Sequence, residues 1–141
     1  MRIKLDEGAF MPERAHKDDA GYDIFTPKDF VLHGMISNSA GMAEIDTGVH
    51  VLIEPGFVGI LKSKSGLNVK HDIIGTGVID ANYTGSIKVK LYNLGVQPHK
   101  FNRGDKLIQL VIYPISTPEL ELVDELPDTE RGNNGFGSTG K

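Results

Sequence analysis

Short apolar stretches separated by glycine and proline dominate this sequence. Seventeen glycines and seven prolines occur among 141 residues, and no segment keeps a helical period of apolar residues over three turns. Since glycine and proline interrupt both helices and central strands, the chain can form only short elements joined by turns. The pattern predicts an all-β sandwich or small β-barrel, which at this length forms one domain.

Several stretches carry the pattern of β-strands. Residues 87–92 alternate between apolar and polar side chains, as a half-buried strand does. Residues 107–112 form an apolar run after the turn signal at 102–105. Further strands are expected at residues 3–5, 43–51, 57–61 and 120–123, the last of which also fits a short turn of helix.

Proline followed by glycine, at Pro55 and Gly56, suits a type II turn between two of these stretches. Residues 49–53 precede the turn and residues 57–61 follow it. We therefore expect the two strands to pair with each other as a hairpin.

Composition excludes several classes of function. The formal net charge is −4, from 15 basic and 19 acidic residues, whereas a general nucleic-acid binder needs a basic excess for the phosphate backbone. The chain has no cysteine, which excludes disulfides and zinc–thiolate sites, and its five histidines lack the spacing of a zinc site. The N-terminus is charged, and no run approaches the roughly 20 apolar residues that span a bilayer. We expect a soluble cytoplasmic protein without nucleic-acid or membrane partners.

The composition changes after Pro127. Residues 127–141 contain a single large apolar side chain, Phe136, and cannot build a core of their own. We therefore divide the chain into a β-domain at residues 1–126 and a C-terminal arm at residues 127–141. Composition alone favours a frayed tail, but Arg131 and the glycines and hydroxyl groups near it also suit an arm that becomes ordered around an anion.

Two polar segments fit either a plain loop or a ligand site. Residues 18–23 hold three carboxylates in six residues, which is also typical of a solvated turn. Residues 62–67 combine two lysines, two serines and a glycine after a predicted strand, so their amides and side chains can meet a phosphate. The spacing of a P-loop is missing, and taken alone this segment is more typical of a polar loop.

The stretch at residues 75–85 is the most suggestive. Val78 and Ile79 are expected to be buried, which places Asp80 where the core meets a turn. A carboxylate at that border is partly withdrawn from water, which raises its basicity, although Asp80 also suits the simple cap of a hairpin turn. Gln109, a polar residue inside an apolar strand, must either bond to neighbouring backbone or face a site.

Taken in order along the chain, five segments resemble the five motifs of the trimeric dUTPase family. The matching residues are 19–24, 64–67, 77–85, 104–109 and 131–140. The third and fifth segments are the most specific, and the resemblance covers nearly the whole chain. It implies a jelly-roll β-barrel with a flexible glycine-rich C-terminal arm. It also implies a homotrimer with three active sites at subunit interfaces, each closed by an arm.

The resemblance further implies hydrolysis of dUTP to dUMP and pyrophosphate with Mg²⁺, which limits uracil incorporation into DNA and supplies dUMP for thymidylate synthesis. Asp80 matches the aspartate that activates water for in-line attack on the α-phosphorus. Tyr83 matches the tyrosine that packs against the deoxyribose and excludes a 2′-hydroxyl, and the backbone of Gly77 and Val78 would read uracil. Asp23 matches the acidic residue that helps hold Mg²⁺, mainly through water.

The remaining matches are to residues that contact the phosphates or cover the base. Barrel residues and arm residues share this task, and the aromatic ring of the arm would stack over uracil. The residues concerned are Lys64, Ser65, Gly66 and Gln109 in the barrel, and Arg131, Phe136, Gly137, Ser138 and Thr139 in the arm.

Three positions depart from the pattern of the family. Lysine stands at Lys64 and Lys106, where the family usually has arginine, and Ile108 replaces an alanine. Lysine keeps the positive charge but loses the bidentate fork of a guanidinium group. The roles of both lysines are therefore open, whereas Ile108 is expected to be a packing change.

Two rival interpretations come from other activities. A dCTP deaminase shares the fold implied by the resemblance, but its catalytic glutamate corresponds to Lys90 here, and that group lacks the glycine-rich fifth motif. The rival from another class is a jelly-roll module that binds a nucleotide or a protein without turnover; loss of the base or of the arm would favour it, and both are present. A purely structural jelly roll would not need Asp80, Tyr83 and Phe136 in these contexts. A regulatory protein partner in addition to catalysis stays open, since such a surface leaves no short motif.

Overall fold

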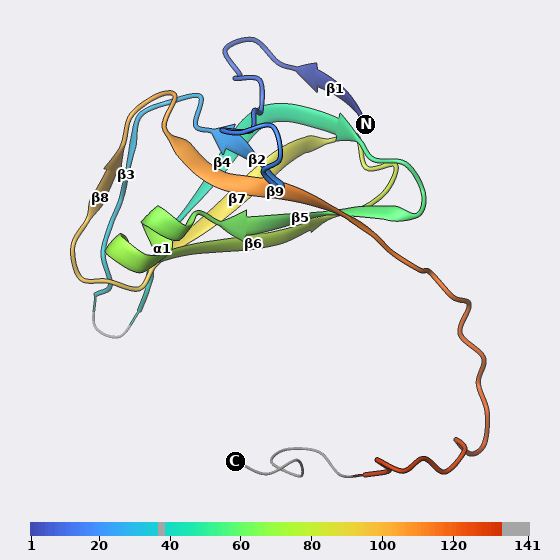
Figure 1. Ribbon diagram of the computed structural model, residues 1–141. Coiled ribbons are helices and arrows are strands. Elements are labelled where there is room, and N and C mark those ends of the chain that lie inside the picture. The colour runs from blue at the N-terminus through green and yellow to red at the C-terminus, as the bar shows by residue number, and fades with distance from the viewer. Residues whose placement is uncertain (37–38, 134–141) are drawn as a thin grey trace.

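The computed structural model describes residues 1–36 and 39–133, and within them the chain forms nine strands and one short helix (Figure 1). Nearly every apolar run of the sequence becomes a strand. In chain order the elements are β1 (Arg2–Leu5), β2 (Gly21–Phe25), β3 (Phe30–Leu32), β4 (Gly41–Leu52), β5 (Phe57–Ser63), α1 (Ser65–His71), β6 (Ile73–Ile79), β7 (Ser86–Asn93), β8 (His99–Phe101) and β9 (Lys106–Pro114).

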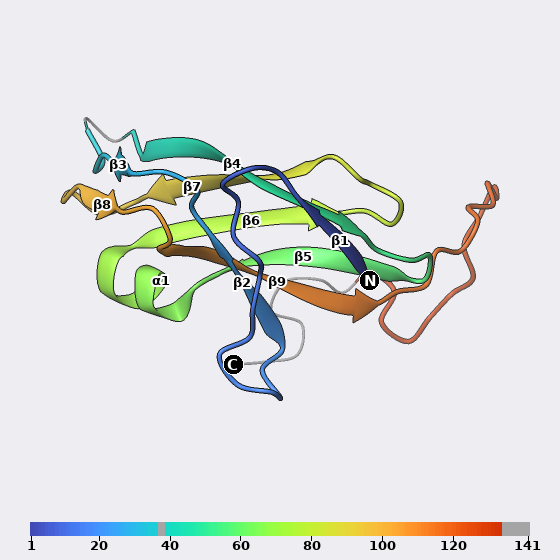
Figure 2. The same ribbon diagram turned by 90° about the horizontal axis from the view of Figure 1, so that it is seen from above.

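Seven of the strands form one antiparallel sheet in the order β1-β4-β7-β6-β5-β9-β2, while β3 and β8 pair separately. Strand β6 joins the two halves of the sheet. Its first residues, Ile73–Gly75, pair with β7, and residues 76–79 pair with β5. The sheet therefore curls, with β4 and β7 on one side and β5 and β9 on the other (Figure 2). This curled antiparallel sheet confirms the predicted all-β, jelly-roll class.

The core lies between the two halves of the curled sheet. Alternating side chains of the strands point inward, as the period of two in a half-buried strand requires. The cluster of buried residues draws on β4 and β7 from one side and on β5 and β9 from the other, including Ile45, Val49, Ile87, Val89, Leu61, Leu107 and Leu110.

The predicted hairpin between β4 and β5 is wrong. The turn exists, since the Phe57 amide donates to the Glu54 carbonyl at 3.2 Å and Gly56 has a φ of 87°. However, β4 pairs with β1 and β7, whereas β5 pairs with β6 and β9. The turn therefore carries the chain from one half of the sheet to the other instead of closing a local pair.

Two further predictions about local structure are wrong. Residues 120–123, all of them described, form neither a strand nor a helical turn. The segment after β5 is not a plain polar loop, because Ser65–His71 form helix α1. None of these seven helical residues is buried, so α1 lacks the apolar stripe by which a helix is recognised in sequence.

The chain leaves the barrel after β9. The Ile115 amide still bonds to the Gly56 carbonyl at 2.9 Å, but residues 116–133 are exposed and run away from the strands (Figure 1). The predicted boundary between residues 126 and 127 stays a prediction, although the last strand already ends at Pro114. Across the described residues, no helix has the length and apolar character needed to cross a membrane.

Candidate active site

Strand register brings three of the predicted motifs together at one end of the barrel. Asp23 of β2 lies opposite Gln109 of β9, and Gln109 lies opposite Lys62 of β5. Because β5 ends one residue before Lys64, this register places the lysine beside Asp23. We call the group formed by Asp23, Lys64, Ser65, Lys106 and Gln109 the anion cluster.

The centre of the anion cluster is a buried carboxylate held by two ammonium groups. Asp23 is only 3% exposed, and one of its oxygens accepts a hydrogen bond from Lys64. The other oxygen lies 2.7 Å from the Lys106 ammonium. Burial acts to raise the pKa of Asp23, but the hydrogen bonds from Lys106 and Lys64 outweigh it, so the pKa lies below its ordinary value. The same contact with Asp23 raises the pKa of Lys106.

The other members of the cluster surround this ion pair. The Gln109 amide donates to the Ser63 carbonyl at 3.2 Å, which partly satisfies the polar residue in the apolar strand. A Cβ atom at Gly21 would lie 2.5 Å from the Gln109 side-chain oxygen, so glycine leaves the room that Gln109 occupies. Ser65 and Gly66 are exposed in the first turn of α1. The cluster thus presents hydroxyl, amide and ammonium donors, with one positive charge in excess.

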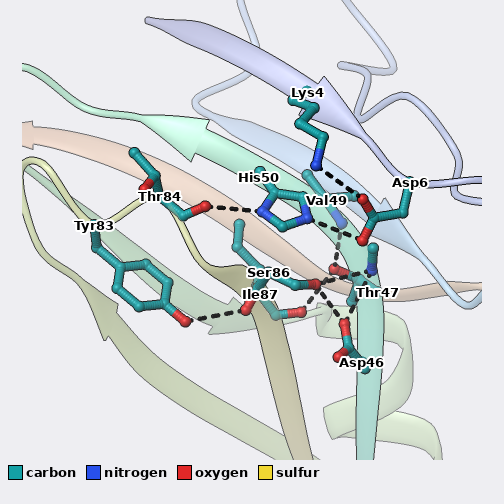
Figure 3. A network of polar contacts seen from close by, with 11 residues as sticks. Lys4, Asp6, Asp46, Thr47, Val49, His50, Tyr83, Thr84, Ser86 and Ile87 are labelled. Atoms are coloured by element: carbon teal, nitrogen blue, oxygen red, sulfur yellow. Dashed lines mark hydrogen bonds and ion pairs between the residues drawn. The ribbon is translucent and has the colours of Figure 1, made fainter.

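The second group of predicted residues lies in the turn that follows β6. The Tyr83 amide donates to the Asp80 carbonyl at 3.2 Å, and Asn82 adopts the left-handed region with a φ of 64°. The Tyr83 hydroxyl donates to the Ser86 carbonyl at 3.2 Å, so the ring lies back over the turn (Figure 3). A Cβ atom at Gly85 would lie 2.4 Å from that hydroxyl oxygen, which only glycine avoids. We call residues 80–85, which include the predicted catalytic residue Asp80, the catalytic turn.

One prediction about the catalytic turn is wrong in the single chain. Val78 is 62% exposed, whereas its neighbour Ile79 is buried. Asp80 is also exposed, so the chain on its own does not withdraw this carboxylate from water. Sequence reasoning missed this because the alternation of β6 turns Val78 away from the core, where an uninterrupted apolar pair had suggested burial.

The anion cluster and the catalytic turn lie at opposite ends of one strand pair. Ile79, just before Asp80, pairs with Gly59 near the start of β5, whereas Lys64 follows the end of β5. At about 3.3 Å per residue, this places Asp80 and Lys64 roughly 20 Å apart. One chain therefore does not bring the predicted catalytic and phosphate-binding residues together.

The largest of the described cavities lies near the anion cluster. Its volume is about 530 Å³, and among the residues predicted for the site it is lined by Ser65. In the arm, Arg131 is exposed and the Gly132 amide bonds to the Thr129 hydroxyl at 3.0 Å. The other predicted arm residues, Phe136, Gly137, Ser138 and Thr139, lie outside the described residues.

The donor set around Asp23 does not fit a directly bound magnesium ion. Both carboxylate oxygens already bind lysine ammonium groups, which a divalent cation would have to displace. Within residues 1–36 and 39–133, no three His, Asp or Glu side chains are grouped as a metal site requires. The predicted contact of Asp23 with Mg²⁺ through water stays a prediction.

Comparison with known proteins identifies the family of the chain. The family model for dUTPase matches residues 7–140. A deoxyuridine 5'-triphosphate nucleotidohydrolase of Mus musculus is 41% identical over 140 residues, covering 99% of this chain and 83% of the relative. A Corynebacterium glutamicum protein of the same name is 40% identical over 144 residues, covering 99% of this chain and 93% of the relative.

Solved structures of dUTPases are also similar to this chain. The Staphylococcus bacteriophage 80alpha dUTPase with dUPNHPP superimposes with a TM-score of 0.88 and 36% identity, covering 99% of this chain and 98% of that one. A variant dUTPase from phage phi11 of S. aureus, whose structure reveals the coordination of a structural Mg(II) ion, gives a TM-score of 0.78 and 37% identity over 90% of this chain and 98% of that one. The chain belongs to the dUTPase family.

Proposed function

We propose that this protein hydrolyses dUTP to dUMP and pyrophosphate at composite sites, each built from more than one copy of the chain. The observation that carries the proposal is the distance of roughly 20 Å between Asp80 and the anion cluster along one strand pair. A homotrimer that sets the catalytic turn of one copy against the anion cluster of the next supplies both halves of each site.

The anion cluster binds the triphosphate in this proposal. Lys64 and Lys106 carry two positive charges against the single charge of Asp23, and Asp23 fixes both ammonium groups in place. Ser65, Gly66 and Gln109 add hydroxyl and amide donors beside them. Phosphoryl transfer depends mainly on alignment and on neutralising charge, which this set of donors is suited to provide.

The catalytic turn acts on the α-phosphorus. Asp80 accepts a proton from a water molecule, whose oxygen forms the new bond to phosphorus as the bond to the bridging oxygen breaks and pyrophosphate leaves. Tyr83 packs against the deoxyribose, and the backbone at the half-buried Gly77 and the exposed Val78 reads the edge of uracil. Asp80 is exposed in the single chain, so a neighbouring copy and a closing arm would withdraw it from water.

The arm closes the site of another copy. Leu120 and Leu122 are 99% and 100% exposed on a segment that leaves its own barrel, so these leucines gain apolar burial only against a second surface. Arg131 would then reach the phosphates together with Ser138 and Thr139 of the same arm. In this proposal, Phe136 stacks over uracil and the amide of Gly137 adds a further donor.

When bound with the triphosphate, Mg²⁺ would supply neutralisation of its negative charge. Because both oxygens of Asp23 bind lysines, this carboxylate serves the site mainly by orienting Lys64 and Lys106.

The direct test incubates the purified protein with dUTP and Mg²⁺, in parallel with dCTP, dTTP and UTP, and follows pyrophosphate release. We expect release from dUTP alone, and a loss of about 10²- to 10⁴-fold in the Asp80→Asn variant, since this is the usual contribution of a general base. Binding of dUTP without release would support a binding module instead, and ammonia release from dCTP would support a deaminase.

A further inference from the structure

Both ring nitrogens of His50 face hydrogen-bond acceptors (Figure 3). Nδ1 lies 2.8 Å from the carbonyl oxygen of Thr84, and Nε2 lies 3.0 Å from a carboxylate oxygen of Asp6. A carbonyl oxygen and an ionised carboxylate can only accept, and a neutral imidazole has only one N–H group. The two contacts are therefore satisfied together only when His50 is an imidazolium ion.

The surroundings of His50 favour this charged form. Asp6 supplies the facing negative charge, while Lys4, which pairs with His50 across β1 and β4, and Arg2, in the same cavity, are positive. From the catalytic turn, the group that faces His50 is the uncharged carbonyl of Thr84. The hydrogen bond to Asp6, followed by the hydrogen bond to Thr84, raises the pKa of His50 above its ordinary value, although partial burial and Lys4 oppose the change.

We propose that His50 is a positioning residue for the catalytic turn: as an imidazolium it ties the Thr84 carbonyl to Asp6 and thereby anchors the turn to β1 and β4. Thr84 directly follows Tyr83 and lies four residues after Asp80, so the anchor acts on the part of the turn that carries both. This inference rests on the proposed function of the catalytic turn.

Deprotonation releases the anchor without unfolding the turn. The charge-assisted bond to Asp6 retains the one remaining proton on Nε2, which leaves the lone pair of Nδ1 facing the lone pairs of the Thr84 oxygen. The bonds from Asn82 to Ile53, at 3.1 Å, and within the turn at Tyr83 are unaffected. The turn therefore stays folded but is less well positioned, so the activity falls as the pH rises through the titration of His50.

The test records the pH profile of kcat/KM for dUTP together with the titration of the His50 ring by NMR. In the wild-type protein we expect an alkaline fall of about tenfold, typical of a misplaced catalytic group, with its midpoint at the titration of His50. Asp6→Asn removes the carboxylate that stabilises the imidazolium, so the fall should move to lower pH. His50→Gln should remove this step and stay at the lower activity. Alkaline steps caused by the lysines of the anion cluster would not respond to either change.

His33→Gln is the matched control, because it removes an exposed histidine elsewhere and should leave the profile unchanged. An active wild-type protein whose alkaline step is absent, or stays in place in Asp6→Asn and His50→Gln, overturns this inference alone. So does a His50 titration below the ordinary range of histidine. A wild-type protein that does not hydrolyse dUTP overturns the proposed function, and the positioning role with it.

Discussion

At the scale of single residues, Asp23 links two positions that the sequence leaves unconnected. Lys64 and Lys106 lie more than forty residues apart and both stand where the family usually has arginine. In the structure the two ammonium groups share one buried carboxylate. The compact, flexible ammonium groups of lysine can each bind one oxygen of Asp23. The two positions that depart from the family pattern therefore contact the same carboxylate.

Replacing Asp23 by asparagine should lower stability in a pH-dependent way. Without the carboxylate, two partly exposed lysines lose their partner, which we expect to cost about 1–3 kcal/mol at neutral pH. Since the pKa of Asp23 is depressed in the folded state, its contribution is present above the pKa of the unfolded chain and is lost as the pH falls through the folded-state pKa. Urea unfolding of wild type and Asp23→Asn should therefore differ at pH 7 and converge in acid.

The matched control for this prediction is Asp18→Asn, since Asp18 is an exposed carboxylate in the loop before β2 and should change stability little at either pH. An equal loss at neutral and acid pH in Asp23→Asn would instead show that the charge of Asp23 is not what stabilises the fold.

At this scale the sequence singles out candidate site residues, but it does not predict how buried they are or which residues they contact. Asp80 and Gln109 were singled out and lie at a turn and in a strand, as the local patterns indicated, whereas Ser65 lies at the start of a helix that those patterns did not predict. The exposure of Val78 and Asp80 was not foreseen, because burial depends on which face of β6 the neighbouring strands cover. His50 was missed because its partners are 34 and 44 residues away.

At the scale of elements, local patterns predicted strands but not their pairing. Alternation of apolar and polar residues, or apolar runs beside turn signals, identified β1, β4, β5, β7 and β9. The prediction of a hairpin between β4 and β5 was wrong, because a proline–glycine turn fits both a hairpin and a connection between the two halves of the sheet. Helix α1 was not predicted for a different reason: of its residues only Leu67 packs against the core cluster, so the segment shows no helical period of apolar residues.

Helix α1 ends on a residue with a strained backbone conformation, so a substitution there tests how much this strain lowers stability. Asp72 adopts the left-handed region with a φ of 54°, and its amide caps the helix through the Asn68 carbonyl. Glycine has no steric cost there, so Asp72→Gly should raise the free energy of unfolding by about 0.5–1 kcal/mol. Urea unfolding measures the change, and the rate of pyrophosphate release should not alter.

Lys70→Gly is the counterpart inside the same helix, where glycine should lower stability by up to about 1 kcal/mol. If both glycine substitutions lower stability equally, backbone strain at Asp72 does not lower the stability of the wild-type protein.

At the scale of the whole molecule, a single chain is an incomplete enzyme in this account. The catalytic turn and the anion cluster are separated along β5 and β6, and residues 116–133 leave the barrel with leucines exposed. The sequence predicted such an assembly only through its resemblance to a family. Composition and periodicity do not predict the distance between the two ends of a strand pair. They therefore could not show that the catalytic turn and the anion cluster lie far apart in one chain.

The measurement that tests composite sites most directly mixes two inactive variants. Asp80→Asn lacks the base and Ser65→Ala lacks a phosphate donor, each expected to lower activity by about 10²-fold or more. In trimers assembled together from equal amounts, about one quarter of the sites receive Asp80 from one chain and Ser65 from the other, both intact. We predict that pyrophosphate release recovers to about that fraction of the wild-type rate. A mixture that stays as inactive as its parents, although mixed trimers have formed, would contradict the account and place each site within one chain.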